Sequence, residues 1–279
     1  MGVLKKVSLA LLCCTAACGP NRTYPERLPY EPAPSQTLTC LPNLDGRIEA
    51  SELQAAFGVP QSVLASPPNV RRTVDLNGVV DSAGRRVWDF ATDFADDRVA
   101  KLEAAALQGQ WFAASFPGGE YVAPLDLGGT VLGVYSEDGE NLLLHGVASA
   151  VENPPEGKTL MPYLAPVALY RYPLELNKTW VSAGETRNAT LRGLPYAGRD
   201  TYSTTIDQSG RLELPDLTFT QALRARTQIT LEPAVGPSIT RRQVSWLFEC
   251  FGEVARAVSV DGETNDNFTT TSELRRLGL

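Results

Sequence analysis

The side chains that could carry out acid–base or nucleophilic chemistry are few. The sequence contains one histidine, His145, and no Gly-x-Ser-x-Gly segment that would present a serine nucleophile. Its densest acidic group holds four aspartates, and two carboxyl groups at the right separation can hydrolyse a glycosidic bond. They are Asp89, Asp93, Asp96 and Asp97. Because such a group more often forms an exposed turn, the sequence favours a protein that is not an enzyme, with a hydrolase that uses only carboxylates as an alternative.

Four arginines in the second half of the chain are a second candidate site. They are Arg224, Arg226, Arg241 and Arg242. If the two segments that carry them pair as strands, positive charge gathers as a basic stripe, which can meet a lipid phosphate or an acidic partner. The other interpretation is a solvated face whose charge is balanced by Glu213, Glu232 and Glu249.

The segment that begins at Leu41 looks like the calcium loop of an EF-hand. Oxygen-bearing side chains stand at its third, fifth, ninth and twelfth positions. They are Asn43, Asp45, Glu49 and Glu52. Leu41 stands where the first carboxylate ligand is expected. Two interpretations stay open: a calcium site, and an Asp-Gly turn that leads into a short helix over residues 50–57. With no histidine cluster for zinc and no glycine-rich phosphate loop, we expect no other cofactor.

The first seventeen residues have the pattern of a secretory signal peptide. Lys5 and Lys6 precede a short apolar run, which is followed by small residues. The stretch Thr15-Ala16-Ala17-Cys18 resembles the lipobox of bacterial lipoproteins, although Thr15 stands where leucine is usual. The resemblance implies that residues 1–17 are removed and that Cys18 carries lipid. An ordinary cleaved signal peptide is the alternative.

The lipobox resemblance also implies an address. Gly19 rather than aspartate follows Cys18, which in lipoproteins of Gram-negative bacteria implies the outer membrane, on its periplasmic side. We therefore expect lipid anchoring in the bacterial cell envelope, a palmitate-bearing N-terminus and the membrane as a partner. The net charge of −7 argues against a nucleic-acid partner.

The remaining cysteines suggest one covalent cross-link. Cys13 and Cys14 fall within the signal peptide and Cys18 is expected to carry lipid, so Cys40 and Cys250 remain. Two cysteines in an oxidising compartment predict a disulfide. Two unpaired buried thiols are the other possibility.

Strand patterns dominate the rest of the chain of 279 residues. In residues 223–231, apolar and polar side chains alternate, and such alternation predicts a strand with one face on a core and one in water. Similar runs joined by short turns, without intervening helices, predict antiparallel sheets. We expect a mainly β protein built of meander sheets, as a curved sheet, a sandwich or a half-barrel, with one short N-terminal helix.

Proline-rich segments suggest the domain organisation. Residues 18–38 contain five prolines and are expected to form a flexible tether. A second segment, 153–166, contains four prolines and is a candidate linker between an N-terminal β-rich half, 39–152, and a C-terminal β-rich half, 167–279. One continuous domain is the alternative.

Three functions remain open on these grounds. The first is a non-catalytic lipoprotein that acts as a binding or envelope-structural module. The second is a carrier of a lipid or another apolar ligand in a β-sheet cavity, whose walls would include some of the tryptophans Trp88, Trp111, Trp180 and Trp246. The third is the carboxylate-only hydrolase.

Overall fold

The computed structural model describes residues 40–53 and 59–278. The predicted signal peptide, Cys18 and the predicted tether over 18–38 lie outside the described residues. Residues 40–279 form one compact unit. Within the described residues there is no helix with the length and apolar character that a membrane crossing requires.

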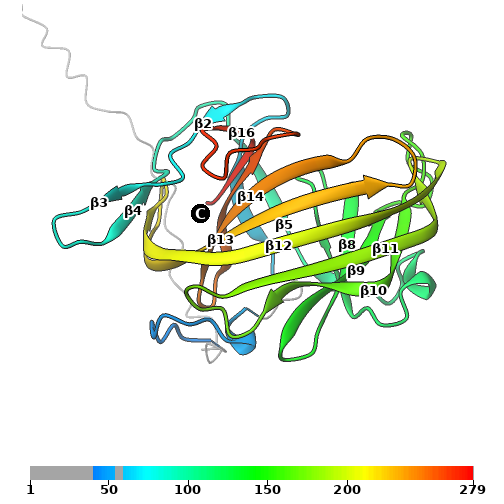
Figure 1. Cartoon of the computed structure of the whole chain (residues 1–279), viewed down its shortest axis with the longest axis horizontal. Helices are drawn as coiled ribbons and strands as arrows, with labels where there is room; N and C mark the ends of the chain where they lie inside the picture. Colours follow the sequence, from blue (N-terminus) through cyan, green and yellow to red (C-terminus); the bar gives the residue numbers. More distant parts are fainter. Residues whose placement is uncertain (1–39, 54–58, 279) are drawn as a thin grey trace, which may run out of the picture. The chain divides into compact units, whose positions relative to one another are not determined.

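The unit is mainly β, with a single large antiparallel meander sheet of sixteen strands that is not closed (Figure 1). In chain order the strands are β1 (Gln61–Ala65), β2 (Arg72–Thr73), β3 (Val79–Val80), β4 (Arg86–Asp89), β5 (Arg98–Leu102), β6 (Ala105–Ala106), β7 (Tyr121–Pro124), β8 (Val131–Glu137), β9 (Asn141–Ser149), β10 (Leu160–Arg171), β11 (Thr179–Leu191), β12 (Leu194–Glu213), β13 (Thr218–Pro233), β14 (Ile239–Phe248), β15 (Gly252–Ser259) and β16 (Thr270–Leu277). Two 3-10 turns, η1 (Ala50–Glu52) and η2 (Ala113–Ser115), complete the elements. The predicted meander is confirmed.

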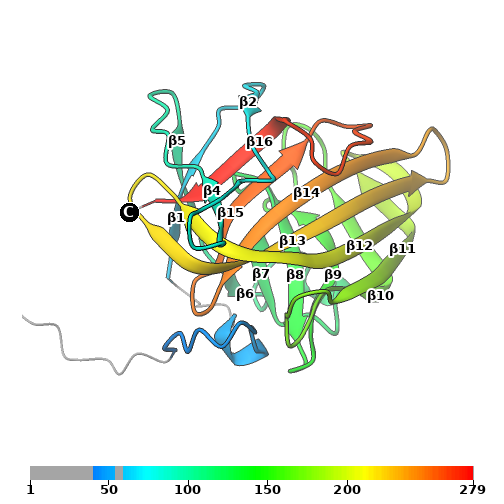
Figure 2. The same cartoon turned by 60° about the vertical axis from the view of Figure 1, so that its left-hand side comes forward.

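The sheet is a meander from β6 to β16, in which each strand pairs with the next, and it continues through β1 to β5. Its edge strands β5 and β6 are joined by only Glu103 and Ala104. Leu102 at the end of β5 and Ala105 at the start of β6 are three Cα–Cα steps apart. Three such steps span at most roughly 11 Å, so the two edge strands must come close to each other at these ends. The sheet is therefore strongly curled, as Figure 2 shows.

The outer face of the curled sheet is covered in part by residues 66–97, which include β2, β3 and β4. Strand β4 pairs in parallel with the end of β12, from Arg86 opposite Gly210 to Asp89 opposite Glu213. A Cβ on Gly210 would lie 2.5 Å from the Arg86 carbonyl oxygen, so glycine permits this close approach.

The covering segment buries a core of aromatic side chains. Trp88 packs edge-to-face on Trp246 at 5.8 Å between ring centroids, and Phe90 packs on the same indole at 4.8 Å. Leu76, Leu212 and other apolar residues of the same cluster complete this core. Burial of these side chains is what holds the covering segment to the sheet.

The inner face of the sheet carries two further apolar clusters. One gathers Leu174, Trp180, Ile206 and Leu247 and also includes Ile48, which forms an isolated bridge with Leu174. The other is rich in tyrosines and includes the stacked rings of Tyr121 and Tyr135. The tryptophans Trp88, Trp180 and Trp246 thus belong to packed cores.

The predicted disulfide between Cys40 and Cys250 is present, with the two Cα atoms 5.5 Å apart. It ties the first described residue to the turn between β14 and β15. The Glu249 carboxylate in the same turn accepts hydrogen bonds from the backbone N–H groups of Asn43 and Leu44, at 2.6 and 2.8 Å. Covalent and polar contacts therefore hold residues 40–44 at one place on the sheet.

Two expectations about local structure need correction. Within the helix expected over residues 50–57, the described residues 50–52 form the 3-10 turn η1, with a capping box of Glu49 and Glu52 and a bond from the Leu53 N–H to the Ala50 carbonyl. Residues 54–58 lie outside the described part of the chain, and the described part holds no α-helix of seven residues or more.

The candidate linker over 153–166 is also not wholly a linker, because residues 160–166 belong to β10. Proline is tolerated there because the pairing of β10 with β9 is interrupted between Pro162 and Val167. Pairing resumes at Val167, which lies opposite Leu144, so the sheet continues through this segment. Both predicted halves lie within the compact unit formed by residues 40–279.

Candidate functional site

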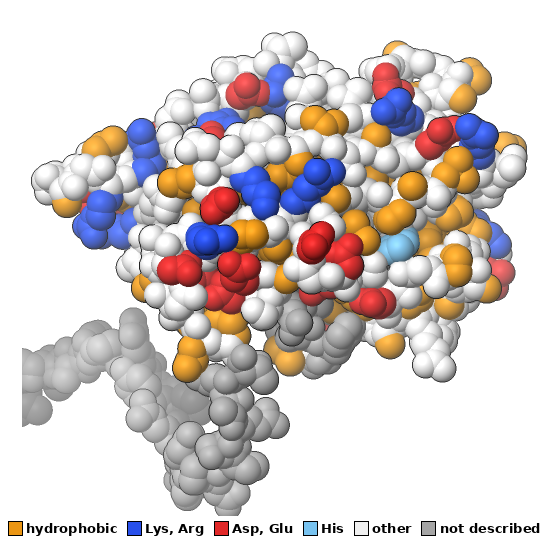
Figure 3. Space-filling view, turned by 60° about the horizontal axis from the view of Figure 1, so that its bottom comes forward, with side chains coloured by type: hydrophobic (Ala, Val, Ile, Leu, Met, Phe, Trp, Pro, Cys, Tyr) orange, Lys and Arg blue, Asp and Glu red, His pale blue; other side chains and the backbone are white. Residues whose placement is uncertain are grey.

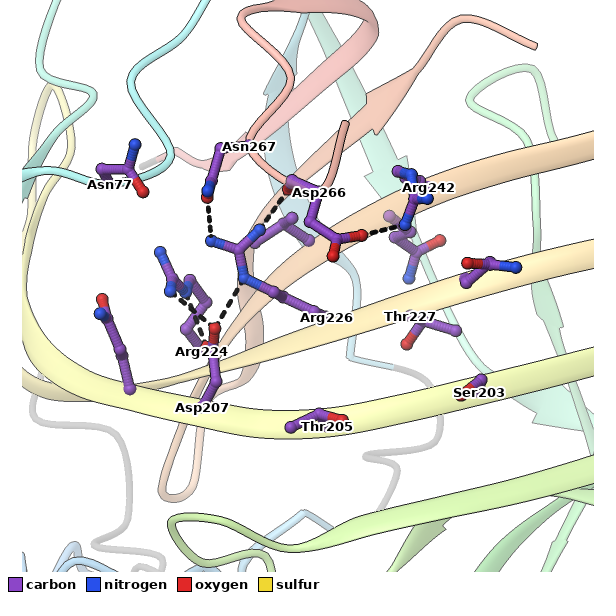
Figure 4. A pocket seen from close by; sticks show the side chains of 14 residues that line it. Asn77, Ser203, Thr205, Asp207, Arg224, Arg226, Thr227, Arg242, Asp266 and Asn267 are labelled. Carbon is purple, nitrogen blue, oxygen red and sulfur yellow. Dashed lines mark hydrogen bonds and ion pairs between the residues drawn. The ribbon is translucent and has the colours of Figure 1, made fainter. Parts of the chain in front are cut away.

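A groove of about 520 Å³ lies on the outer face of strands β12, β13 and β14 (Figure 4). Thirteen of its fourteen lining residues are polar or charged, with Val244 as the exception. Strand β12 supplies Ser203, Thr205 and Asp207, and β13 and β14 supply three arginines. A lining of this kind suits a polar ligand and differs from the apolar walls that a lipid carrier requires.

Asp207 sits between two of the arginines. Its carboxylate accepts a bidentate pair of bonds from Arg224, at 2.8 and 2.7 Å, and a third bond from Nε of Arg226 at 2.7 Å. The register of β12 against β13 shifts between Ile206 and Gln208, so Asp207 is the extra residue of a bulge. The bulge aims its carboxylate between arginines that are two positions apart on the next strand.

Arg224 is a buried, fully engaged member of this group. Only 2% of its side chain is exposed, it also donates to the Leu76 carbonyl, and its guanidinium lies 5.5 Å from the ring centroid of Trp88. The sequence predicted that this polar strand face would lie in water. That expectation is wrong at Arg224, because the covering segment that contains Leu76 and Trp88 packs over it.

The loop between β15 and β16, residues 260–269, accepts hydrogen bonds from the other two arginines of the groove. Arg226 donates to the Asp266 carbonyl and to the Asn267 side-chain oxygen. Arg242 donates to the Asp266 carboxylate and to the carbonyls of Glu263 and Thr264, the last two at 3.1 and 2.9 Å. The loop therefore lies along one wall of the groove.

The groove has a positive electrostatic balance. Three guanidiniums face two carboxylates, Asp207 and Asp266, which leaves one positive charge in excess. Burial, and next the neighbouring charge of Arg224, lower the pKa of Arg226, which shows that this guanidinium is crowded by a like charge. Such a site gains from an additional anion, while the hydroxyl and amide groups around it can bind a ligand's polar atoms.

The structure brings three of the four predicted arginines together and leaves one apart. Arg224, Arg226 and Arg242 line the groove, whereas Arg241 alternates to the other face of β14 and pairs with Asp261 at 2.8 Å. Sequence reasoning missed Asp207, Asp266 and Asn267. The bulge that places Asp207 and the packing of residues 260–269 against the sheet have no local signal in the sequence.

The residues of the EF-hand-like loop make hydrogen bonds with one another. The Asn43 amide donates to Glu52 at 3.2 Å, the Asp45 N–H donates to Asn43 Oδ1 at 2.8 Å, and Glu52 accepts from the Glu49 N–H at 2.8 Å. These are the contacts of a turn and a capping box. Across the described residues, no group of three or more His, Cys, Asp or Glu side chains is arranged to hold a metal ion. The geometry therefore matches the Asp-Gly turn interpretation.

The acidic group at 89–97 is divided among different partners. The Asp97 side chain is buried between Arg72, at 3.0 Å, and Arg276, while Asp96 pairs with Arg72 at 2.5 Å. Asp89 accepts a bond from the Ala91 N–H at 3.0 Å, and Asp93 is exposed. Of the four carboxylates, Asp97 thus holds the covering segment to strand β16, whereas Asp96 pairs within the segment.

His145 contacts a serine that sequence reasoning did not single out. Its Nε2 lies 2.7 Å from Ser136 Oγ on the neighbouring strand β8, and burial lowers the pKa of His145. Ser136 is buried, and neither residue lines the groove described above. The histidine, pale blue in Figure 3, reaches a surface where acidic and basic side chains are mixed with hydrophobic ones.

Comparisons with known proteins add no family or fold relative. A scan against protein-family models, a search of curated proteins and a search of solved structures each found no match to this chain. The assignment of a function must therefore depend on the groove and on the sequence.

Proposed function

We propose that this protein is a non-catalytic, lipid-anchored binding module of the bacterial cell envelope, on the periplasmic side of the outer membrane, whose groove binds a polar phosphorylated ligand of the phosphosugar class. The single observation that carries the ligand class is the groove with its excess of arginine charge and its lining of hydroxyl and amide groups. The lipobox-like stretch that ends at Cys18 supports the address.

The ligand chemistry follows from what the groove offers. Guanidinium groups form bidentate, charge-assisted hydrogen bonds with phosphate oxygens. Ser203 and Thr205 offer hydroxyls, and Asn77, Gln208 and Gln228 offer amides, all of which match the hydroxyl groups of a sugar. A volume of about 520 Å³ lies within the range of small-molecule sites.

The envelope address has independent support in the disulfide. A bond between Cys40 and Cys250 persists in oxidising compartments and is rare where thiols are kept reduced. Replacement of Cys18 by serine is expected to release the protein from membranes into the soluble fraction. Persistent membrane association of the Cys18→Ser protein would contradict the lipid anchor.

Calorimetric titration of the full chain with glucose 6-phosphate at low salt tests the ligand class. We expect saturable binding that is at least tenfold tighter than binding of glucose or of inorganic phosphate alone, since the groove offers arginines for the phosphate and polar side chains for the sugar hydroxyls. Arg226→Met is expected to weaken binding tenfold or more, the loss of roughly one charge-assisted bond pair. Arg241→Met, an arginine of the same strand region outside the groove, is the matched control and should bind as the wild type does.

A second titration separates a soluble phosphosugar from a lipid headgroup. Vesicles of phosphatidylglycerol present a glycerol phosphate at a membrane surface. Binding to glucose 6-phosphate that is lost in Arg226→Met supports the soluble ligand. Binding to the vesicles alone, equal binding by the Arg226→Met and wild-type proteins, or no binding to either probe would overturn the proposal.

A further inference from the structure

The two carboxylates of the groove are held very differently. Asp207 belongs to a strand, and its oxygens accept three bonds from Arg224 and Arg226. Asp266 belongs to the 260–269 loop, and 70% of its side chain is exposed although it pairs with Arg242. Exposed ion pairs contribute little to stability, typically about 0–1 kcal/mol. Asp207 is therefore a fixed part of the site, whereas the Asp266 carboxylate is held weakly.

Asp266 also lies where a bound anion would be expected. On the antiparallel pair of β13 and β14, Arg226 is opposite Val244 and Arg242 is opposite Gln228, so the two arginines are diagonal neighbours on one face. Asp266 contacts both, through its carbonyl with Arg226 and through its carboxylate with Arg242. Figure 4 shows this residue between the two guanidiniums.

From this arrangement, and resting on the proposed function, we infer that in the free protein the Asp266 carboxylate occupies the position where the ligand's phosphate binds. On binding, the phosphate displaces this carboxylate and lies between Arg226 and Arg242. The charges agree with this exchange. Once Asp266 leaves, three guanidiniums face only Asp207, and the excess becomes two positive charges. A phosphate monoester carries a charge of about −1.5 to −2 at neutral pH.

The exchange makes Asp266 an autoinhibitory residue. In the free protein its carboxylate competes with the ligand, so the apparent affinity is lower than the arginines alone would give. The Asp266 carboxylate also pairs with Arg242 when no ligand is bound, so this guanidinium has an anionic partner in both the free and the bound protein. The carbonyl contacts from Glu263 and Thr264 keep the loop near Arg242 when the carboxylate has moved.

Neutralisation of the competing carboxylate tests this inference. Titration of glucose 6-phosphate into the Asp266→Asn protein should give a dissociation constant roughly three- to fivefold lower than that of the wild type, the equivalent of one exposed ion pair. Asp261→Asn is the matched control: Asp261 lies in the same loop, pairs with Arg241 and is 55% exposed. It removes the same charge away from the groove and should change the dissociation constant less than twofold.

The outcomes distinguish the inference from the function on which it rests. If the wild type binds glucose 6-phosphate and Asp266→Asn binds it equally or more weakly, Asp266 is part of the binding site or a bystander, and the inference fails alone. An equal gain in Asp261→Asn would show a general charge effect and would also defeat it. If none of the three proteins binds the probe, the proposed function fails as well. Melting temperatures of the three proteins verify that the fold is retained.

Discussion

Two arginine clusters lie on the outer face of the same sheet, and they differ in what covers them. Arg276 on β16 lies beneath residues 66–97, with a side chain that is 1% exposed, and it donates to the Phe90 and Thr92 carbonyls and to Asp97. Arg226 and Arg242 lie in the groove, and each guanidinium meets a loop whose Asp266 carboxylate is mostly exposed.

Whether residues 66–97 pack over an arginine therefore decides its role in this sheet more than the residue type does. Beneath the covering segment, carbonyls and the buried Asp97 carboxylate accept hydrogen bonds from both Nη groups of Arg276. The Phe94 ring centroid lies 5.1 Å from the Arg276 guanidinium and 4.2 Å from that of Arg72. Such a group fixes the structure. Where the segment ends, the same residue type faces a polar groove and can exchange one partner for another.

Loss of the disulfide is expected to give the largest effect and to act on both clusters together. Cys40 and Cys250 are separated by 210 residues, and for a loop of that length the chain-entropy model gives a stabilisation of roughly 5 kcal/mol. Chemical denaturation of Cys40→Ser, Cys250→Ser and the double variant should show equal, non-additive losses. Additive losses would mean that each cysteine acts alone.

A methionine in place of each arginine should separate the two clusters by stability. Arg276→Met leaves Asp97, whose side chain is 6% exposed, with a buried charge and one partner fewer, and should lower the free energy of unfolding by about 3–5 kcal/mol. Arg242→Met breaks a pair with an exposed aspartate and two hydrogen bonds to the Glu263 and Thr264 carbonyls, leaves no buried charge unpaired, and should cost less, about 2 kcal/mol or below. Comparable losses for the two variants, measured by urea denaturation, would remove the distinction between them.

The smallest expected effect concerns a buried carboxylate on the inner face. Asp200 accepts a bond at 2.6 Å from the Tyr163 hydroxyl rather than from an arginine, and burial raises the pKa of Asp200 above its usual 3.8 even though this bond acts in the opposite direction. The folded state therefore binds the proton more tightly than the unfolded state. Folding is weakened above the folded pKa and recovers as the pH falls through it.

Asp200→Asn, which keeps an acceptor for Tyr163 and removes the charge, should consequently raise the melting temperature at pH 7. The gain should shrink as the pH approaches 3, where the wild-type carboxyl is protonated. A variant that is less stable than the wild type at pH 7 would show that the charge of Asp200 is stabilised by groups that this account omits.

The sequence predicts the strands of the groove better than it predicts their surroundings. Alternation over residues 223–231 places Arg224 and Arg226 on one face, and pairing with the strand of Arg242 follows from a meander. These features depend on neighbours along the chain. The bulge at Asp207 depends on the register between the long strands β12 and β13, and the alternation of polar and apolar side chains does not specify a shift in that register.

Contacts between distant segments account for what the sequence could not show. The burial of Arg224 depends on Leu76, which is 148 residues away, and the parallel pairing of β4 with β12 has no local signature. Three of the four tryptophans that suggested a ligand cavity, Trp88, Trp180 and Trp246, prove to be core residues for the same reason. Which polar strand face is covered is a property of the whole chain.

Titration of isotope-labelled protein with glucose 6-phosphate, followed through the arginine Nε–Hε resonances, tests the central claim most directly. The account predicts that the resonances of Arg226 and Arg242, assigned through their methionine variants, shift saturably, while that of Arg276 stays in place. Unchanged groove resonances at millimolar ligand, or equal shifts for Arg276, would contradict the claim that the uncovered arginines form a phosphate-binding site.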